Sequence, residues 1–171
     1  MGNALEALRR STAKFEPTMA DRARRHPIRP CKLLVWEEAH ASAMPPQIQA
    51  HLKQCDAMPG PTTTLVVEDS NLVIAYGGIN LLHQYSGEVW TVPIEEVAQR
   101  YPRELYYYAK DFITRVAAEL HLKRVQVTTR AASPELDKWI ARLSVGFRLD
   151  GILPKYGPDG EDYKMWSVTW G

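Results

Sequence analysis

Cysteine is scarce in this sequence, and the scarcity limits the chemistry the chain can support. Cys31 and Cys55 are the only two cysteines, and neither belongs to a CxxC pair or to a Cys/His cluster. A disulfide framework and a structural zinc site are therefore not expected. We predict that both cysteines are small residues, buried or half-buried in the interior.

Long apolar runs and an excess of charge of one sign are also missing. No stretch approaches 18 apolar residues and no charged-then-apolar leader is present, so neither a membrane span nor a signal peptide is expected. We expect synthesis inside the cell and no membrane partner. The net charge of +1 gives the whole molecule no strong field for nucleic acid or acidic membranes.

Several catalytic motifs are absent. The chain shows no Ser-His-Asp order, no glycine-rich phosphate loop and no zinc-ligand spacing, which leaves hydrolases, nucleotide hydrolases and metalloenzymes without support. With 171 residues, of which 45% are hydrophobic, the chain is large enough for one domain with a substantial core.

Residues 1–30 differ from the rest of the chain because they are strongly basic. Seven Lys and Arg residues stand against three acids there, and the apolar spacing predicts one or two short amphipathic helices. This arm is either a solvated extension packed on its own domain or a docking segment for an acidic partner or nucleic acid. The second reading assigns partner contacts to Arg9, Arg10, Arg22, Arg24 and Arg25.

The remaining residues, 31–171, are predicted to form one domain of alternating strands and helices. Short turns separate three consecutive strands, which predicts an antiparallel meander, and Gly77-Gly78 indicates a bulge or a close backbone approach in the middle one. Ser133-Pro134-Glu135 predicts a helix start, and Gly146 predicts the corresponding stop. The expected strands are 32–36, 62–68, 72–82, 87–93, 123–129, 147–153 and 162–170, and the expected helices are two pieces within 37–57, one over 102–122 and one over 133–143.

The stretch from Gly87 to Asp111 predicts a strand that feeds a long helix opening near Pro102. A helix N-terminus presents unpaired N–H groups and a positive dipole end, so a phosphorylated cofactor would bind here. The strand that follows the helix would pair in parallel with the strand before it, through a right-handed crossover.

This order of elements, with Ser133 and the later run Leu143-Ser144-Val145-Gly146-Phe147, resembles the GNAT N-acyltransferase fold. The resemblance implies an α+β domain of three layers: a mixed, mostly antiparallel central sheet with helices on both faces. The N-terminal helical arm would be an addition to that fold. In the family, the loop after the fourth strand holds the pyrophosphate of an acyl-CoA. The matching positions here are Gln99, Arg100 and Arg103.

Four residues, in three parts of the pattern, depart from the family. Pro102 and Glu104 stand where the loop has small residues, so a backbone donor is lost and a negative charge is added. Arg142 replaces a tyrosine that often protonates the leaving thiolate, and arginine cannot exchange a proton. Glu135 replaces a frequent asparagine. Together these departures predict a fold that has lost its chemistry and binds no cofactor.

A narrower resemblance points to the internal virion protein A-like family of short-tailed bacteriophages. It is carried by Ala75-Tyr76-Gly77-Gly78-Ile79 and Glu88-Val89-Trp90-Thr91-Val92, followed by the long charged helix and the terminal hairpin. It implies a virion or assembly protein, located in the virion or the host cytoplasm, that binds other phage structural proteins or itself. Trp166 and Trp170, on one face of the last strand, would serve as partner contacts.

The alternative hypothesis is an active N-acyltransferase that uses acetyl-CoA on an unknown amine. Glu88 would be the catalytic base, and Gln99, Arg100 and Arg103 would hold the cofactor. Glu68, Glu95 and Glu96 are further carboxylates that could point into the predicted cleft. The simpler interpretation is that Glu95 and Glu96 are solvated loop acids and that Glu88 faces water beside Tyr85. The run Tyr106-Tyr107-Tyr108 cannot form one aromatic face, because consecutive helical residues point in different directions.

Overall fold

The structure is a computed structural model that describes residues 31–35 and 46–171. The predicted basic arm, with its five partner-contact arginines, and the first helical piece after residue 36 lie outside the described residues. The described elements are β1 (Cys31–Val35), α3 (Pro46–Asp56), β2 (Thr62–Val67), β3 (Val73–His83), β4 (Ser86–Pro93), α4 (Glu95–Ala98), α5 (Pro102–Glu119), β5 (Arg124–Arg130), α6 (Pro134–Arg142), β6 (Arg148–Leu153) and β7 (Tyr163–Thr169).

The strands form one sheet of seven in the order β1-β2-β3-β4-β5-β7-β6. Strands β2 to β4 form the antiparallel meander that their short connections predict, and β1 pairs antiparallel with β2. The crossover through α5 makes β4 and β5 parallel, and β7 returns antiparallel between β5 and β6. The predicted mixed, mostly antiparallel sheet is confirmed.

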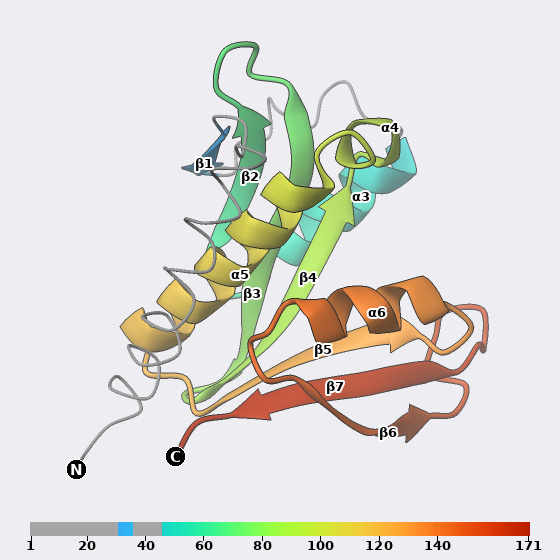
Figure 1. Cartoon of the computed structure of the whole chain (residues 1–171). Coiled ribbons are helices and arrows are strands. Elements are labelled where there is room, and N and C mark those ends of the chain that lie inside the picture. Colours follow the sequence, from blue (N-terminus) through green and yellow to red (C-terminus); the bar gives the residue numbers. More distant parts are fainter. Residues whose placement is uncertain (1–30, 36–45) are drawn as a thin grey trace.

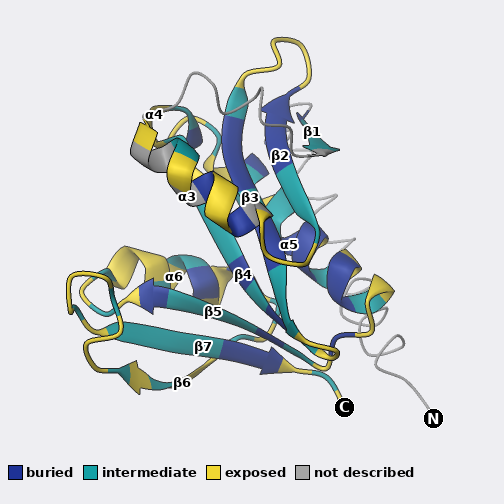
Figure 2. Cartoon of the chain, turned by 180° about the vertical axis from the view of Figure 1, so that it is seen from behind, coloured by how far each residue is buried: buried dark blue, intermediate teal, exposed yellow. Residues whose placement is uncertain are grey.

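Helices cover both faces of the sheet (Figure 1). On one face, α5 packs its apolar side on a core cluster that includes Ile79, Ile113 and Val125, which are at most 1% exposed. On the other face, Leu52 of α3 packs with Tyr76 of β3, and both are fully buried. Figure 2 shows the resulting gradient, from the buried middle strands β2 and β3 to the more exposed edge strand β6.

The glycine pair in β3 marks a close approach and not a bulge. A Cβ added to Gly78 would lie 2.8 Å from the carbonyl oxygen of Pro61 and 2.8 Å from the indole nitrogen of Trp90. The register shifts in this part of the sheet lie between Leu65 and Val66, and between Leu81 and His83. Gly78 therefore lets the backbone before β2 and the Trp90 ring pack against β3.

The helix ends follow the sequence signals with two differences. Helix α6 begins at Pro134 and Ser133 is its N-cap residue, but the Ser133 hydroxyl makes no capping hydrogen bond. The four-residue helix α4 occupies a stretch predicted as a charged connection. No helix among the described residues is long and apolar enough to cross a membrane.

Edge strand β6 is tied to the sheet by a polar network around Asp150. Its carboxylate accepts hydrogen bonds from the Ser167 hydroxyl and the Arg124 guanidinium. Both contacts lower the pKa of Asp150, and the hydrogen bond from Ser167 has the larger effect. The two ion-paired side chains are about one-third exposed, which limits the energy they contribute.

We expect this network to make stability depend on pH. The pKa of Asp150 is lower in the folded than in the unfolded chain, so its contribution is complete above about pH 3.9 and is lost as the pH falls through the folded value. Asp150→Asn should lower the free energy of unfolding by about 1 kcal/mol at pH 7. The loss should be smaller at pH 3 than at pH 7, because pH 3 lies below the pKa of the unfolded chain. Denaturant titrations of both proteins at the two pH values measure this, and an equal loss at both would contradict it.

Candidate functional site

The candidate site lies where the two parallel strands separate. Only Ser86, Gly87 and Glu88 of β4 pair with β5, at Arg124, Val125 and Gln126. Beyond these pairs, β4 continues along β3 as far as Pro93 and β5 continues along β7 as far as Arg130. The two strands therefore diverge from a common point, as Figure 1 shows, and among the described residues no strand pairs with their facing edges there.

Glu88 stands at the last of these parallel pairs. Its Oε1 accepts a hydrogen bond from Thr128 Oγ1 of β5 at 3.2 Å, and the side chain is half-buried. Asn80 of β3 is directly opposite, and its Oδ1 accepts a hydrogen bond from the Trp90 indole at 3.0 Å. Within the described part of the chain, no basic side chain forms an ion pair with Glu88.

The other candidate carboxylates are not brought to this point. Glu68 follows β2 and is exposed, and Glu95 and Glu96 are exposed on α4. The interpretation of Glu95 and Glu96 as solvated acids is therefore confirmed. Among the four glutamates considered from the sequence, only Glu88 lies where the strands diverge.

The loop between α4 and α5 has few free backbone donors. The N–H groups of Gln99, Arg100 and Tyr101 donate to carbonyl oxygens of α4, at 3.0, 2.9 and 3.1 Å, and Pro102 has no N–H. The backbone cradle typical of a phosphate site is therefore largely absent here. The side chains of Gln99, Arg100 and Arg103 are exposed around the start of α5 and supply the polar and positive groups instead.

Glu104 does not have the position that the loop pattern predicted for it. It is only 5% exposed. At about 100° per helical residue, it lies about 160° around α5 from Tyr106, whereas Arg103 lies about 60° from Tyr106. The Tyr106 hydroxyl contacts Ser144 just after α6, so Arg103, and not Glu104, lies on that side of α5.

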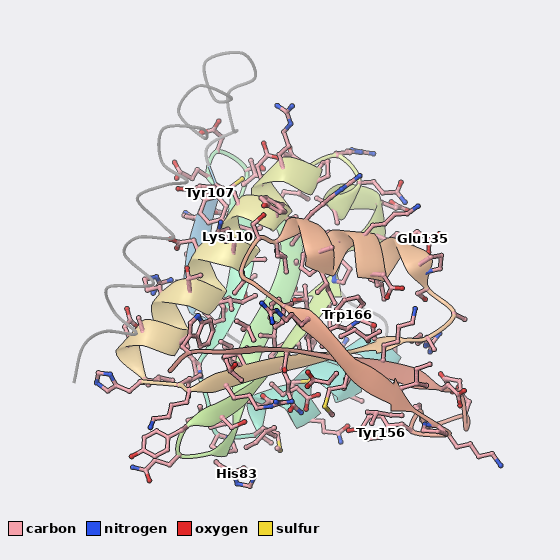
Figure 3. The ribbon with its side chains drawn as sticks, turned by 60° about the horizontal axis from the view of Figure 1, so that its bottom comes forward. His83, Tyr107, Lys110, Glu135, Tyr156 and Trp166 are labelled. Atoms are coloured by element: carbon pink, nitrogen blue, oxygen red, sulfur yellow. The ribbon has the colours of Figure 1, made fainter. Side chains whose placement is uncertain are left out.

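The end of α6 meets α5 at Tyr106. The Tyr106 hydroxyl donates to Ser144 Oγ at 3.5 Å, and Ser144 Oγ donates to the carbonyl oxygen of Arg142 at 3.0 Å. Lys110, one turn further along α5, is buried, and this burial lowers its pKa. Figure 3 shows Lys110 and Tyr107 on α5 close to the end of α6. Arg142 occupies the family's tyrosine position, and a tyrosine from another helix, Tyr106 of α5, lies at this junction.

The three consecutive tyrosines point in different directions, as predicted. Tyr106 packs on the main core cluster, and Tyr107 is exposed. Tyr108 donates a hydrogen bond to the Cys31 carbonyl oxygen, and burial, followed by the Coulombic effect of Cys31, raises its pKa. A small cavity of about 40 Å³ lies between α5 and strands β1 to β4. Its lining includes Gly77, Val89, Thr91, Ala109 and Phe112.

The two tryptophans predicted as partner contacts are both half-buried within the domain. The Trp166 indole donates to Thr129 Oγ1 at 3.3 Å. Lys164, two residues earlier on the same face, pairs with Asp137 of α6, so Trp166 lies on the side of β7 that faces that helix. Trp170 packs against the main core cluster. Contact of either residue with another protein stays a prediction.

Comparison with known proteins gives structural but not sequence relatives. No family model matches the sequence, and no curated protein matches it. Among solved structures, the ribosomal-protein-S5-alanine acetyltransferase of Vibrio fischeri is 14% identical, with a TM-score of 0.61 over 82% of this chain and 95% of that one.

Two further similar structures come from other bacteria. A variant of the spermidine N-acetyltransferase SpeG of Vibrio cholerae is 10% identical, with a TM-score of 0.63 over 81% of this chain and 93% of that one. A GNAT-family acetyltransferase of Bacillus anthracis is 13% identical, with a TM-score of 0.57 over 71% of this chain and 72% of that one.

These findings overturn two predictions. The main functional prediction, a phage virion or assembly protein without catalysis, is contradicted because the similar structures are acetyltransferases, and nothing supports the narrower phage resemblance. The expectation of no cofactor fails for the same reason. Pro102 and Glu104 depart from a loop pattern, but they do not alter the architecture around the diverging strands. The chain has the GNAT fold of the N-acetyltransferases.

Proposed function

We propose that this protein is an acyl-CoA-dependent N-acyltransferase whose active site is the divergence of β4 and β5. The observation that carries the proposal is Glu88, which stands at the last parallel pair with a hydrogen bond from Thr128 and no basic partner among the described residues. Similarity of fold to acetyltransferases supports the reaction class, although fold alone does not assign a reaction.

The residues at this site would hold the phosphates of an acyl-CoA with side chains more than with backbone N–H groups. Beyond Glu88, β4 has backbone groups without a strand partner, which suit the amide-rich arm of CoA. At the other end, Gln99, Arg100 and Arg103 surround the start of α5, where positive charge and the helix dipole favour phosphates. When bound, the thioester would supply an activated acyl group.

Two residues of the diverging strands act in the proton transfer. Glu88 accepts the proton that the acceptor amine loses as it forms its new bond, and Thr128 holds the carboxylate in place. A small cavity beneath α5 is lined by Val89 and Thr91 of the same diverging strand.

A thiol-release assay tests the proposal directly. The purified chain should release thiol from acetyl-CoA in the presence of a suitable amine, and mass spectrometry should show the acetylated product. The panel should include a polyamine, a peptide with an N-terminal alanine and free amino acids. Absence of product across the panel, together with no acetyl-CoA binding in isothermal titration calorimetry, would refute the proposal.

The phosphate-binding role of Arg100 gives a separate prediction. Arg100→Ala should raise the Kd for acetyl-CoA about tenfold at low salt, because a charge-assisted contact worth about 1.4 kcal/mol is lost. The effect should shrink as ionic strength rises. Calorimetry with acetyl-CoA and with S-acetylpantetheine, which lacks the nucleotide phosphates, measures it.

The matched control is Arg115→Ala, which removes an exposed arginine near the other end of α5. Its Kd for acetyl-CoA should equal that of the unmodified protein. An equal loss of affinity for S-acetylpantetheine in Arg100→Ala would show that Arg100 does not act on the phosphates.

A further inference from the structure

Five polar residues form one continuous row across the sheet, and the candidate base is one of them. The strand register places them side by side in the order Asn80, Glu88, Gln126, Ser167 and Arg148, one from each of β3, β4, β5, β7 and β6. Side chains paired in this way point to the same side of a sheet. The hydrogen bond from Thr128 to Glu88 agrees, because Thr128 is two residues after Gln126. We call these five residues the polar row.

The polar row lies on the face of the sheet opposite α5 and α6. Val89 packs in the core cluster under α5, so its neighbour Glu88 points to the other side. Lys164 of β7 pairs with Asp137 of α6, and Ser167 is an odd number of residues further along the same strand, so it points away from α6. The cofactor contacts proposed at the start of α5 are therefore on one side of the sheet, and the polar row is on the other.

Helix α3 covers only part of this second face. Its Leu52 packs with Tyr76 of β3 and Trp90 of β4, and the Trp90 indole donates to Asn80, which closes the row at that end. No described helix crosses β5 or β7 on this side, as Figure 2 shows. An amine that reaches Glu88 from this face therefore has room for the rest of its molecule over β5 and β7.

The charged members of the polar row differ from other charges on this face, because they are not ion-paired. Arg124 and Arg130, the two arginines of β5, both form ion pairs with acids. Neither Arg148, which is exposed, nor Glu88 forms an ion pair with a described residue. Gln126 between them is half-buried, and its side-chain amide has no hydrogen-bond partner among those residues. The row therefore offers a negative end, neutral polar groups and a positive end.

The length of the row fits a short peptide. Neighbouring strands lie about 4.8 Å apart, so the three spacings from β4 to β6 separate the backbones at Glu88 and Arg148 by about 14 Å. An extended peptide advances about 3.4 Å per residue, so about four residues cover this span. The amide of Gln126 can donate to and accept from a peptide backbone, and Arg148 can bind a carboxylate. A polyamine would instead bring a second cation to Arg148.

We propose that the acceptor is a short peptide with a free C-terminus, about four residues long, that lies across β5 and β7 along the polar row. This inference rests on the proposed function. The N-terminal nitrogen bonds to the acyl carbon while Glu88 takes its proton, and the carbon–sulfur bond breaks with its electron pair on sulfur, which takes a proton from water. The C-terminal carboxylate pairs with Arg148, which determines specificity and takes no part in the bond changes.

The test compares two peptides that differ only in the charge at the C-terminus, tetra-alanine and its C-terminal amide. At low salt, the unmodified protein should acetylate the acid with a kcat/KM about tenfold above that for the amide, because only the acid pairs with Arg148. The ratio should fall as the ionic strength rises. Di-alanine is too short to span the row, so it should show a smaller preference over its own amide.

Arg148→Gln should lower kcat/KM for the acid about tenfold, to the value for the amide, with the Kd for acetyl-CoA unchanged. The matched control is Arg115→Gln, an exposed arginine of α5 on the other side of the sheet, which should keep the full preference. Equal rates with acid and amide in the unmodified protein, or a preference that survives in Arg148→Gln, would overturn the acceptor assignment and leave the proposed function intact. An unmodified protein that acetylates no amine at all would refute both.

Discussion

Replacing Glu88 with Gln should lower kcat/KM for acyl transfer about 100-fold or more. Glutamine has almost the same shape and can still accept the hydrogen bond from Thr128, which lies 3.2 Å from the Glu88 carboxylate. It cannot take a proton from an amine near pH 7, so the base is lost while the local packing remains. Steady-state thiol release, measured below saturation with each substrate, gives the ratio.

The design includes a matched control and a separate binding measurement. Glu68→Gln makes the same change at an exposed glutamate just after β2 and should leave the rate unchanged. Calorimetry should show that Glu88→Gln binds acetyl-CoA as the unmodified protein does. A Glu88→Gln variant with full activity would contradict the assigned base, and water or another group would then have to accept the proton.

Replacing Ile79 with Ala should lower the free energy of unfolding by about 3 kcal/mol. Ile79 is fully buried in the main core cluster, and it pairs across the sheet with Val89 of β4. Removing three carbons there leaves a cavity between the sheet and α5 that the surrounding residues cannot fill. Urea titration followed by tryptophan fluorescence measures the change.

Ile152→Ala provides the comparison, because Ile152 is 58% exposed on the edge strand β6. The same removal of carbons should change the unfolding free energy by less than about 0.5 kcal/mol. Equal losses in the two variants would mean that the core does not lie where the structure places it.

The order of strands and helices could be predicted because its signals are local. Turn residues after Glu68 and around Gln84 separate the meander strands, and apolar residues three and four apart mark the buried face of α5. Helix α4 was missed because four residues are too few to show a helical period. The mixed sheet could therefore be predicted from patterns that each segment carries by itself.

The contacts within the site could not be predicted, since they join residues that are distant in sequence. Thr128 and Glu88 are 40 residues apart, and their contact depends on the register of a parallel pair. Tyr106 and Ser144 meet only because α5 and the end of α6 cover the same face of the sheet. No pattern in the chain encodes either register or helix placement.

The prediction of lost chemistry failed for a related reason. It compared single residues with a loop pattern and treated Glu104 as a charge facing the ligand. The structure places Glu104 in a buried position, on the side of α5 away from Tyr106. A charge acts on a ligand only through its direction and solvation, and neither is visible in a motif comparison.

The short parallel pairing between β4 and β5 also affects the order in which the protein is expected to fold. Strands β2, β3 and β4 follow one another through tight turns, so each pairing closes a short loop. The parallel pairing of β4 with β5 closes a long loop, because α4 and α5 lie between the two strands in sequence. Only three residue pairs form in return for the entropy lost in that closure. We expect the meander to form first and the pairing of β4 with β5 to form last, after α5 has packed on the sheet.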